Sequence, residues 1–510
     1  MDNSTFDRIK EWFDNYLKEY FEKATDKDLI ESFSLKKDHT FRVVENIERI
    51  ACALRFDEAR INIARAIALF HDIGRFPQYL KYRTFKDADS VNHGVLSAEI
   101  IKEAGILKHI SEEEREVIIT AIKFHNALSI PDLPKKALLF LRLIRDADKL
   151  DIWRIFSEYL SLPSKDRPSG AFLGLPDTDG VSEEIVRSLK ERRIASLKHA
   201  TNINDFRLIQ LSWVFDLNFR ESFRMIKDGD LYQIANISNP NQEVKEAIDD
   251  VFGYIEKRAD PKVYFIGAGP GDPELITLKG RRLLDEADVI IYAGSLVNPA
   301  LLDGTKAEIY NSATMTLNEI IEIIKDSFLE GKTVARLHTG DPSIYSAISE
   351  QIERLRQLNI EYKIVPGVSS AMAGASVLGQ ELTIPEISQT VIFTRLEGRT
   401  PVPEREKLSE LSRHRATMVI FLSAGMIERV KEELLQGYPE DTPVAIVEKA
   451  TWPEQRIIRG RLKELDILVK EAGIKKTALI YVGETLKASL EHTGKESRLY
   501  NREFKHGFRL

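Results

Sequence analysis

The sequence has a single cysteine, Cys52, among its 510 residues. One thiol excludes an intramolecular disulfide and a zinc site made of several cysteines, and a reducing compartment favours such low cysteine usage. Long apolar runs are also missing. Residues 137–144 are the strongest candidate, and Arg142 interrupts them, whereas a membrane-spanning helix needs about 20 apolar residues. The first residues lack the basic start and apolar core of a secretory signal. We therefore expect a cytoplasmic protein with no membrane segment.

An excess of charge of either sign is missing as well. The chain has 73 Lys and Arg against 80 Asp and Glu, a net charge of -7, with 43% apolar and 30% charged residues. This balance is typical of a soluble globular protein and excludes a disordered or collagen-like chain. It gives no electrostatic reason to expect nucleic acid or a membrane surface as the main partner. The length predicts two or three domains.

The pattern of the chain changes near Asp260. Before it, apolar residues recur at steps of three and four, which predicts an all-α region. After it, short apolar runs end in glycine-containing turns and alternate with helical stretches, which predicts α/β architecture. We expect largely parallel pairing, in two sheets because the run is too long for one. The predicted organisation is an all-α domain at 1–254, a linker at 255–262, and α/β subdomains at 263–378 and 379–510.

Histidine and aspartate recur through the helical half. HDIG at 71–74 places His71 beside Asp72, and RDADKLD at 145–151 is rich in aspartate. Imidazole nitrogens and carboxylate oxygens together bind divalent metals of intermediate hardness, such as manganese, iron, nickel, cobalt or zinc. One helix face cannot supply every ligand, so a metal site in an all-α domain needs ligands from several helices. The candidates are His39, His71, Asp72, His93, His125, Asp146, Asp148 and Asp151.

In this order the residues resemble the HD superfamily of metal-dependent phosphohydrolases, over residues 30–160. The resemblance implies a divalent metal, with magnesium added to the cations named above, bound by four ligands: His39, His71, Asp72 and Asp148. Asp148 takes the last position rather than Asp146. His93 and His125 would hold a second metal, with Asp72 as the bridge. Such a centre activates water for attack on the phosphorus of a nucleotide or another phosphoester.

Two alternatives stay open for this half. Arg75 and Lys149 could contact phosphate oxygens, or they could be solvated helix ends. The domain could hydrolyse a phosphoester, or it could be a non-catalytic nucleotide sensor that regulates the rest of the chain. The complete set of ligands favours hydrolysis. The sequence names neither the metal nor the substrate.

Three glycine-rich turns follow strands in the second half. The first, in VYFIGAGPGDPELITL, has the spacing G-x-G-x-G at Gly267, Gly269 and Gly271, which differs from the dinucleotide fingerprint. The second contains Gly340 and Asp341 in HTGDPSIY, and the third lies in VPGVSS. Turns at the carboxyl ends of parallel strands form the ligand crevice of an open α/β sheet. We expect Asp341 to accept a hydrogen bond from a ribose hydroxyl or an amine.

Several segments of this half resemble the tetrapyrrole methylase family, and specifically its precorrin-4 C(11)-methyltransferase branch, aerobic or cobalt-dependent. They are GAGPGDPELITLKG, YAGSLV, TGDPSIY, VPGVSS, SQTVIFTRLEGRTPVPE, WPEQRIIRG and the closing FKHGFR. The resemblance spans residues 262–510 and implies methyl transfer from S-adenosylmethionine to carbon 11 of precorrin-4, or of cobalt-precorrin-4, in cobalamin (corrin) biosynthesis. It also implies two α/β domains with the active site between them, and a homodimer. An RNA methylase is a less favoured alternative.

The resemblance carries cofactor contacts to eight positions: Pro270, Thr339, Gly340, Asp341, Ser369, Ser370, Leu422 and Ala450. Leu422 stands where relatives often have Met, and Ala450 where they often have Gly. Because the methyl sulfonium is already activated, no general base is needed and none is assigned. Arg395 and Arg399 are candidates for the acidic side chains of the substrate. An internal ion pair with Glu397 is the alternative for both.

Overall fold

The structure, a computed structural model, describes residues 1–163, 172–227, 229–294 and 296–487. The segment FKHGFR, at 504–509, and Ser295 of YAGSLV lie outside the described residues. The chain forms two compact units, Met1–Pro261 with Lys325–Lys332, and Lys262–Ile324 with Thr333–Leu510. The predicted fold class, a helical region followed by an α/β region with two sheets, is confirmed.

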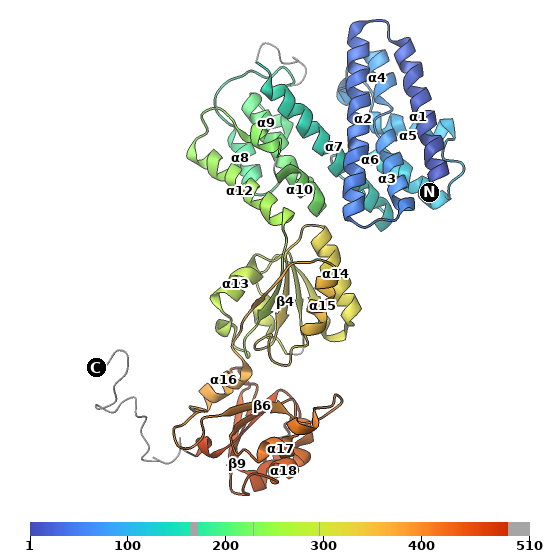
Figure 1. The fold of residues 1–510 in the computed structure, drawn as a ribbon. Coiled ribbons are helices and arrows are strands. Elements are labelled where there is room, and N and C mark those ends of the chain that lie inside the picture. Colours follow the sequence, from blue (N-terminus) through green and yellow to red (C-terminus); the bar gives the residue numbers. More distant parts are fainter. Residues whose placement is uncertain (164–171, 228, 295, 488–510) are drawn as a thin grey trace, which may run out of the picture. The chain divides into compact units, whose positions relative to one another are not determined.

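The helical unit is built around one apolar core that extends from Met1 to Ala259. Its helices begin at polar caps: the side chains of Asp26, Asp57, Asn92 and Ser111 each accept a hydrogen bond from a backbone N–H of the following helix. The helices, seen in Figure 1, are α1 (Asn3–Lys23), α2 (Lys27–Ala53), α3 (Glu58–Phe70), α4 (Arg75–Tyr82), α5 (His93–Ala104), α6 (Glu112–Phe124), α7 (Lys135–Ser161), α8 (Glu183–Lys190), α9 (Ile203–Ser212), α10 (Arg220–Lys227), α11 (Leu231–Ala235) and α12 (Gln242–Ala259).

The end of α12 overlaps the linker predicted at 255–262. Ile255 and Ala259 lie four residues apart on this helix and both are buried in the core of the helical unit. This is the spacing of one face of a helix. The exact limits of the domains stay predictions.

The first sheet of the α/β unit is parallel throughout. Its strand order is β3-β2-β4-β1-β5, and α13 (Leu278–Asp285) lies on one side with α14 (Leu317–Leu329) and α15 (Ser349–Gln357) on the other (Figure 1). The central strand β4 is buried along its whole length, as parallel strands covered by helices are. The strands are β1 (Val263–Gly267), β2 (Val289–Tyr292), β3 (Glu308–Asn311), β4 (Val334–His338) and β5 (Tyr362–Val365).

The second sheet is mixed, so the prediction of largely parallel pairing is wrong there. Only β6 and β7 pair in parallel, whereas β10 runs antiparallel to β7 and β8, and β8 antiparallel to β9. The short segment 449–455 joins β8 to β9 without a crossover helix, which allows only antiparallel pairing. The strands, in the order β6-β7-β10-β8-β9, are β6 (Val391–Arg395), β7 (Thr417–Phe421), β10 (Ala478–Val482), β8 (Pro443–Glu448) and β9 (Arg456–Arg461).

Helices cover both faces of this mixed sheet. Alternate residues of β7 point to opposite faces: Met418 packs with α17 (Leu408–Ser412), α18 (Ile427–Leu434) and α19 (Leu465–Glu471). Val419 packs with Ala371 of α16 (Ser370–Val377). Thus α16, predicted to be in the first subdomain, contributes its apolar residues to the core of the second sheet.

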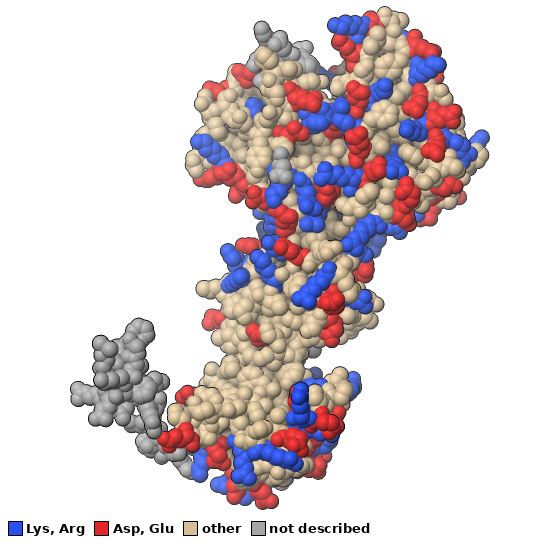
Figure 2. Space-filling model, in the orientation of Figure 1, with Lys and Arg blue, Asp and Glu red and all other residues tan. Residues whose placement is uncertain are grey.

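In the part of the chain that the structure describes, no helix is both long and apolar enough to cross a bilayer. Figure 2 shows Lys and Arg interspersed with Asp and Glu over the visible face of the helical unit. The visible face of the α/β unit carries a wide uncharged area around its middle. This distribution agrees with the nearly balanced composition.

Candidate metal centre and cofactor-binding loops

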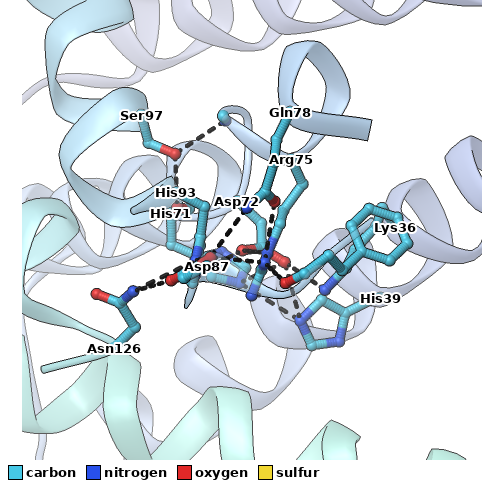
Figure 3. Close-up of polar contacts among 12 residues, drawn as sticks. Lys36, His39, His71, Asp72, Arg75, Gln78, Asp87, His93, Ser97 and Asn126 are labelled. Carbon is cyan, nitrogen blue, oxygen red and sulfur yellow. Dashed lines mark hydrogen bonds and ion pairs between the residues drawn. The ribbon is translucent and has the colours of Figure 1, made fainter. Parts of the chain in front are cut away.

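Five helices or helix ends bring the six predicted metal ligands together. Figure 3 shows four of them, His39, His71, Asp72 and His93. His39 lies within α2, and His71 follows the last residue of α3, with Asp72 next to it. His93 opens α5 and His125 follows α6, while Asp148 lies within α7. The four histidines and Asp72 are buried, and the side chain of Asp148 is 20% exposed. Asp148 is therefore the most exposed of the six predicted ligands.

The first group of ligand atoms surrounds a point between His39 and His71. Their Nε2 atoms are 3.4 Å apart, and His39 Nε2 is 3.1 Å from Asp148 Oδ1 and 3.7 Å from Asp72 Oδ2. His71 Nε2 lies 3.8 Å from Asp72 Oδ2 and 3.9 Å from Asp148 Oδ1. Two nitrogens and two oxygens so arranged can share one divalent ion.

A second group lies on the other side of Asp72. The Nε2 atoms of His93 and His125 are 3.0 Å apart, and they lie 3.4 Å and 3.9 Å from Asp72 Oδ1. Asp72 therefore offers Oδ2 to the first group and Oδ1 to the second. This is the geometry of a carboxylate that bridges two ions.

The other nitrogen of each imidazole, Nδ1, already makes a hydrogen bond within the protein. Nδ1 of His71 donates to the carbonyl oxygen of Ala68, and Nδ1 of His125 donates to that of Ile122, both at 2.7 Å. Nδ1 of His39 donates to Asp151 Oδ2 at 2.6 Å, and Nδ1 of His93 donates to Asp87 Oδ2 at 2.7 Å. Each group thus has one histidine held by a carbonyl and one held by a carboxylate, as metal-binding histidines commonly are.

Burial keeps most of these rings neutral. It lowers the pKa of His93 to about 4 and that of His125 to about 4, and it lowers the pKa of His71. His39 differs: burial and Lys36 would lower its pKa, but hydrogen bonds to Asp148 and Asp151 leave it raised. With Nδ1 carrying the proton, a neutral ring presents a lone pair at Nε2. Two such lone pairs face each other between His93 and His125, and a cation between them would remove that repulsion.

Positive charge also surrounds Asp72. Lys36 Nζ lies 2.8 Å from Oδ2, and Arg75 Nε lies 3.4 Å from Oδ1. Burial alone would raise the pKa of Asp72, but Lys36, His71 and Arg75 outweigh it and hold the pKa well below its usual range. Asp72 is therefore a carboxylate that is ready to bind metal at neutral pH.

Arg75 and Lys149, the two candidates for phosphate contact, are not solvated helix ends. The Arg75 side chain is 14% exposed and donates to Asp87 and to the carbonyl of Phe85. Lys149 is 12% exposed and pairs with Asp216 at 2.6 Å. Arg75 is thus part of the metal centre, and Lys149 belongs to an ion pair beside it.

Asp146 has a structural role. It is fully buried and accepts hydrogen bonds from the backbone of Asn218 and Phe219 and from the hydroxyl of Ser222. It therefore fastens α7 to the start of α10. The preference for Asp148 over Asp146 as a ligand agrees with this arrangement.

Asp87 is the residue of this site that the sequence did not reveal. It lies in a short 3-10 turn, Asp87–Asp89, within a polar segment that carries no apolar period. Its carboxylate also accepts from Asn126 Nδ2 and Gln78 Nε2. Burial would raise the pKa of Asp87, but the hydrogen bond and charge of His93 lower it to about 2.

In the α/β unit, three glycines bring the three predicted turns into contact. A Cβ added to Gly367 would lie 2.2 Å from the carbonyl oxygen of Gly340, and one added to Gly267 would lie 2.5 Å from Cα of Gly367. The backbones of Gly269 and Gly340 exchange hydrogen bonds of 3.3 and 2.8 Å. Only residues without side chains allow the turns after β1, β4 and β5 to approach so closely.

Asp341 and Ser369 hold these turns. Asp341 Oδ2 accepts from the backbone N–H of Gly367 at 2.9 Å, and Oδ1 accepts from that of Ser343 at 2.8 Å. The hydroxyl of Ser369 caps α16, which begins at Ser370. Asp341 therefore joins the second turn to the third. Its bond to a ribose hydroxyl, and the cofactor contacts of Thr339, Gly340, Ser369 and Ser370, stay predictions.

Residues just after β8 of the second sheet make hydrogen bonds to the first turn. Trp452 Nε1 donates to the carbonyl oxygen of Pro270 at 2.9 Å, and the Thr451 hydroxyl accepts from the backbone N–H of Asp272 at 3.0 Å. The adjacent Ala450 is buried. Leu422, by contrast, is 68% exposed and has a φ of 54° just after β7. An exposed leucine in the left-handed region is uncommon and is often found at functional sites.

A group of aromatic side chains includes Phe421, which directly precedes Leu422. Tyr345 is a weaker sequence candidate beside the predicted cofactor positions, whereas Phe393 and Phe421 were not predicted. The rings of Tyr345 and Phe421 are 5.1 Å apart, and those of Phe421 and Phe393 are 6.0 Å apart. Arg395, two residues after Phe393 on β6, donates to the carbonyls of Thr400 and Pro401. Arg395 thus shapes its own loop rather than pairing with Glu397, within the described contacts.

Comparisons with known proteins agree with both resemblances. Residues 262–466 match the model of the tetrapyrrole (corrin/porphyrin) methylases. A cobalt-precorrin-4 C(11)-methyltransferase of Methanocaldococcus jannaschii is 56% identical over 251 residues, which are 49% of this chain and 96% of that relative. The chain belongs to the tetrapyrrole methylase family. Residues 37–153 of this methylase match the HD domain model and include all six predicted metal ligands.

Further relatives match the same half of this tetrapyrrole methylase. A precorrin-4 C(11)-methyltransferase of Pseudomonas aeruginosa is 49% identical over 248 residues, 48% of this chain and 98% of that relative. The solved structure of a cobalt precorrin-4 methyltransferase, a cobalamin biosynthetic enzyme, is 48% identical, with a TM-score of 0.44 over 45% of this chain and 97% of that one.

Proposed function

We propose that the α/β unit transfers the methyl group of S-adenosylmethionine to carbon 11 of precorrin-4 or cobalt-precorrin-4, in cobalamin biosynthesis. The observation that carries this proposal is the 56% identity to a cobalt-precorrin-4 C(11)-methyltransferase over 96% of its length. The contact of Gly267, Gly340 and Gly367 supports it, because it brings together the carboxyl ends of three adjacent strands, where open α/β sheets bind their ligands.

Methyl transfer requires mainly that the protein position the methyl donor and the acceptor carbon. S-adenosylmethionine supplies a methyl group on a positively charged sulfur, so alignment of donor and acceptor can provide much of the acceleration. Pro270 and Ala450 would line the cofactor on the sides of the first and second sheets. Leu422 stays a predicted cofactor contact. Because Leu422 and Tyr345 are both exposed, they would also contact the flat tetrapyrrole. Arg399, exposed and without an ion pair among the described residues, remains a candidate for its carboxylates.

The test is methyl transfer by the full chain to enzymatically prepared precorrin-4 and cobalt-precorrin-4. The expected product gains one methyl group, and NMR assigns it to carbon 11. The preferred substrate decides between the aerobic and the cobalt-dependent pathway. Methylation of RNA, without methylation of either tetrapyrrole, would contradict the proposal and revive the RNA alternative.

We also propose that the helical unit is a metal-dependent phosphohydrolase. The observation that carries this proposal is that the two carboxylate oxygens of Asp72 face separate groups of histidines. The fit to metal rests on the donors themselves: neutral imidazoles with committed Nδ1 atoms, next to carboxylates of lowered pKa. A nucleotide sensor would need no such pair of ligand groups.

The residues of this chain suggest how a phosphoester would be bound. A divalent ion, when present, lowers the pKa of water and neutralises phosphate oxygens. Lys36, 18% exposed beside Asp72, can turn toward a phosphate once the carboxylate binds metal. Asp148, with a side chain that is 20% exposed, is the predicted ligand that solvent reaches most easily.

The corresponding test is phosphate release with manganese from a panel of nucleotides and phosphorylated cobalamin precursors. Turnover that is lost in Asp72→Ala would establish the activity and name the preferred substrate. Tight binding of a nucleotide with no release from any member of the panel would favour the regulatory alternative. A homodimer, with the chain in the cytoplasm, remains the prediction for assembly and location.

A further inference from the structure

A separate cavity of about 230 Å³ lies behind His39, on the side of its Nδ1 atom. It is bounded by α2, α7, α10 and α11, and none of the six predicted metal ligands lines it. Asp151, which accepts from His39 Nδ1, forms part of its wall. The cavity is therefore next to the metal centre but distinct from it.

Two arginines on different helices meet at this wall. Nε of Arg42 and Nε of Arg154 both donate to Asp151 Oδ1, at 3.0 and 2.7 Å. The Nη2 atom of Arg154 is buried and has no hydrogen-bond partner among the described residues. A guanidinium has five N–H donors, and a buried donor without an acceptor is costly. Arg154 Nη1 already pairs with Glu158, so Nη2 is the donor of this guanidinium that lacks an acceptor within the described part of the chain. Because Nη2 is buried, the side chain must shift before a ligand in the cavity can supply one.

The rest of the lining limits what that ligand is. The cavity has an apolar wall made of Leu150, Met225 and Leu231. It also has two negatively charged side chains, Glu45 and Asp230. The volume exceeds that of an inorganic phosphate, so there is room for an organic body. The carboxylates of Glu45 and Asp230 oppose a ligand with several negative charges.

We propose that this cavity binds a small organic anion with one carboxylate or phosphate group, held by Arg42 and Arg154, and with its apolar body against Leu150, Met225 and Leu231. Guanidinium groups bind such oxyanions through paired hydrogen bonds. The proposal concerns a second ligand and goes beyond both activities proposed above.

The site is connected to the metal centre through one carboxylate. An anion that takes donors of Arg42 and Arg154 leaves more of the Asp151 charge to His39 Nδ1. A stronger acceptor at Nδ1 makes Nε2 a better metal ligand. Anion and metal should therefore increase each other's affinity by the same factor. This coupling rests on the proposed metal centre, whereas the anion site itself does not.

The first experiment measures binding by calorimetry to the full chain after removal of metal with a chelator. The probes are adenosine monophosphate, hexanoate, inorganic phosphate and adenosine triphosphate. We expect the monophosphate or hexanoate to bind more tightly than inorganic phosphate and the triphosphate. The two organic probes distinguish a phosphate ligand from a carboxylate ligand.

Variants then locate the site. Arg42→Gln and Arg154→Gln each remove charged donors and should weaken binding at least about 10-fold. Arg49→Gln is the matched control, because Arg49 lies on the same helix as Arg42 and pairs with Glu221 instead. If Arg154→Gln does not fold, Arg42→Gln decides alone, since the Arg42 side chain is 35% exposed.

Two results would overturn the anion site: no probe binding below about 10 mM, or equal binding by the wild type, Arg42→Gln and Arg154→Gln. The coupling is measured separately as the manganese affinity with and without the bound probe. Equal manganese affinities would overturn the coupling only. Absence of manganese binding would contradict the proposed phosphohydrolase and leave the anion site standing.

Discussion

At the scale of residues, Asp72 is shared by two groups of ligands, and its removal should disable both. In Asp72→Ala we expect manganese binding to weaken by more than the ~10–100-fold that loss of an outer partner costs. Calorimetry would measure affinity and stoichiometry. Asp38→Ala is a suitable control, because Asp38 is exposed on α2 next to His39. An unchanged stoichiometry in Asp72→Ala would contradict the bridging role.

Asp87 should affect only one of the two groups. It supports His93 but makes no recorded contact with His39 or His71, so Asp87→Asn should weaken one equivalent of metal by about 10–100-fold and spare the other. A titration with two resolved steps would show this. Equal weakening of both steps would mean that Asp87 acts on the whole centre rather than on His93.

The buried histidines predict how stability depends on pH without metal. His93 and His125 have a pKa of about 4 in the folded protein, against an ordinary value of 6.5. Between these values the unfolded chain binds more protons, so the free energy of unfolding should fall as the pH drops from 6.5 to 4. The raised pKa of His39 acts in the opposite sense, since the stability it contributes is present at low pH and is lost as the pH rises.

Urea denaturation of the chelator-treated protein at several pH values would measure this fall. In His93→Gln the slope should be shallower, because one of the buried histidines with a lowered pKa is gone. A free energy of unfolding that stays constant from pH 6.5 to 4 in the wild type would rule out neutral buried histidines.

At the scale of elements, helix ends place the ligands. His71 and His125 each follow the last residue of a helix, and each donates to the carbonyl three residues before it. Apolar periodicity predicted the helices, whereas the resemblance to the HD superfamily implied which residues would be ligands. The structure brings those residues together, and their role as ligands stays a prediction. The supporting carboxylate of Asp87 was not predictable, because its partner His93 is set by the fold and not by spacing along a helix.

The strands show a similar division. The three glycine turns could be predicted from their sequences, because a tight turn after a strand requires glycine. The direction of the strands in the second sheet could not, since alternation of strands and helices is compatible with both directions. The burial of Ile255 and Ala259 also shows that a boundary read from charged residues can fall inside a helix.

The contact between the glycine turns gives a prediction for the cofactor. In Gly367→Ala the new Cβ would lie 2.2 Å from the Gly340 carbonyl oxygen, so the turns must separate. We expect binding of S-adenosylhomocysteine to weaken at least about 10-fold, by roughly the cost of one or two lost hydrogen bonds. Gly253→Ala, with open space around it, is the control. Unchanged binding in Gly367→Ala would exclude these turns from the cofactor site.

At the scale of the whole molecule, the two units have separate cores and separate candidate sites. Asp72→Ala should therefore keep full methyl transfer, and Gly367→Ala should keep phosphate release within about twofold, as expected for sites that share no residues. Both activities would be assayed in both variants. Loss of methyl transfer in Asp72→Ala would instead favour a helical unit that regulates the methylase.

The glycine contact also bears on how such an enzyme can change its substrate over evolutionary time. Gly267, Gly340 and Gly367 come from distant parts of the sequence. Gly267 and Gly367 cannot gain a side chain unless the other turns retreat, and Gly340 has a φ of 62°, which disfavours any side chain. Substitutions at these three glycines should therefore be rare. Leu422 and Tyr345, exposed at the rim, can be exchanged without disturbing the glycine contact. We therefore expect new substrate specificities to arise by substitution at Leu422 and Tyr345, while the three glycines are retained.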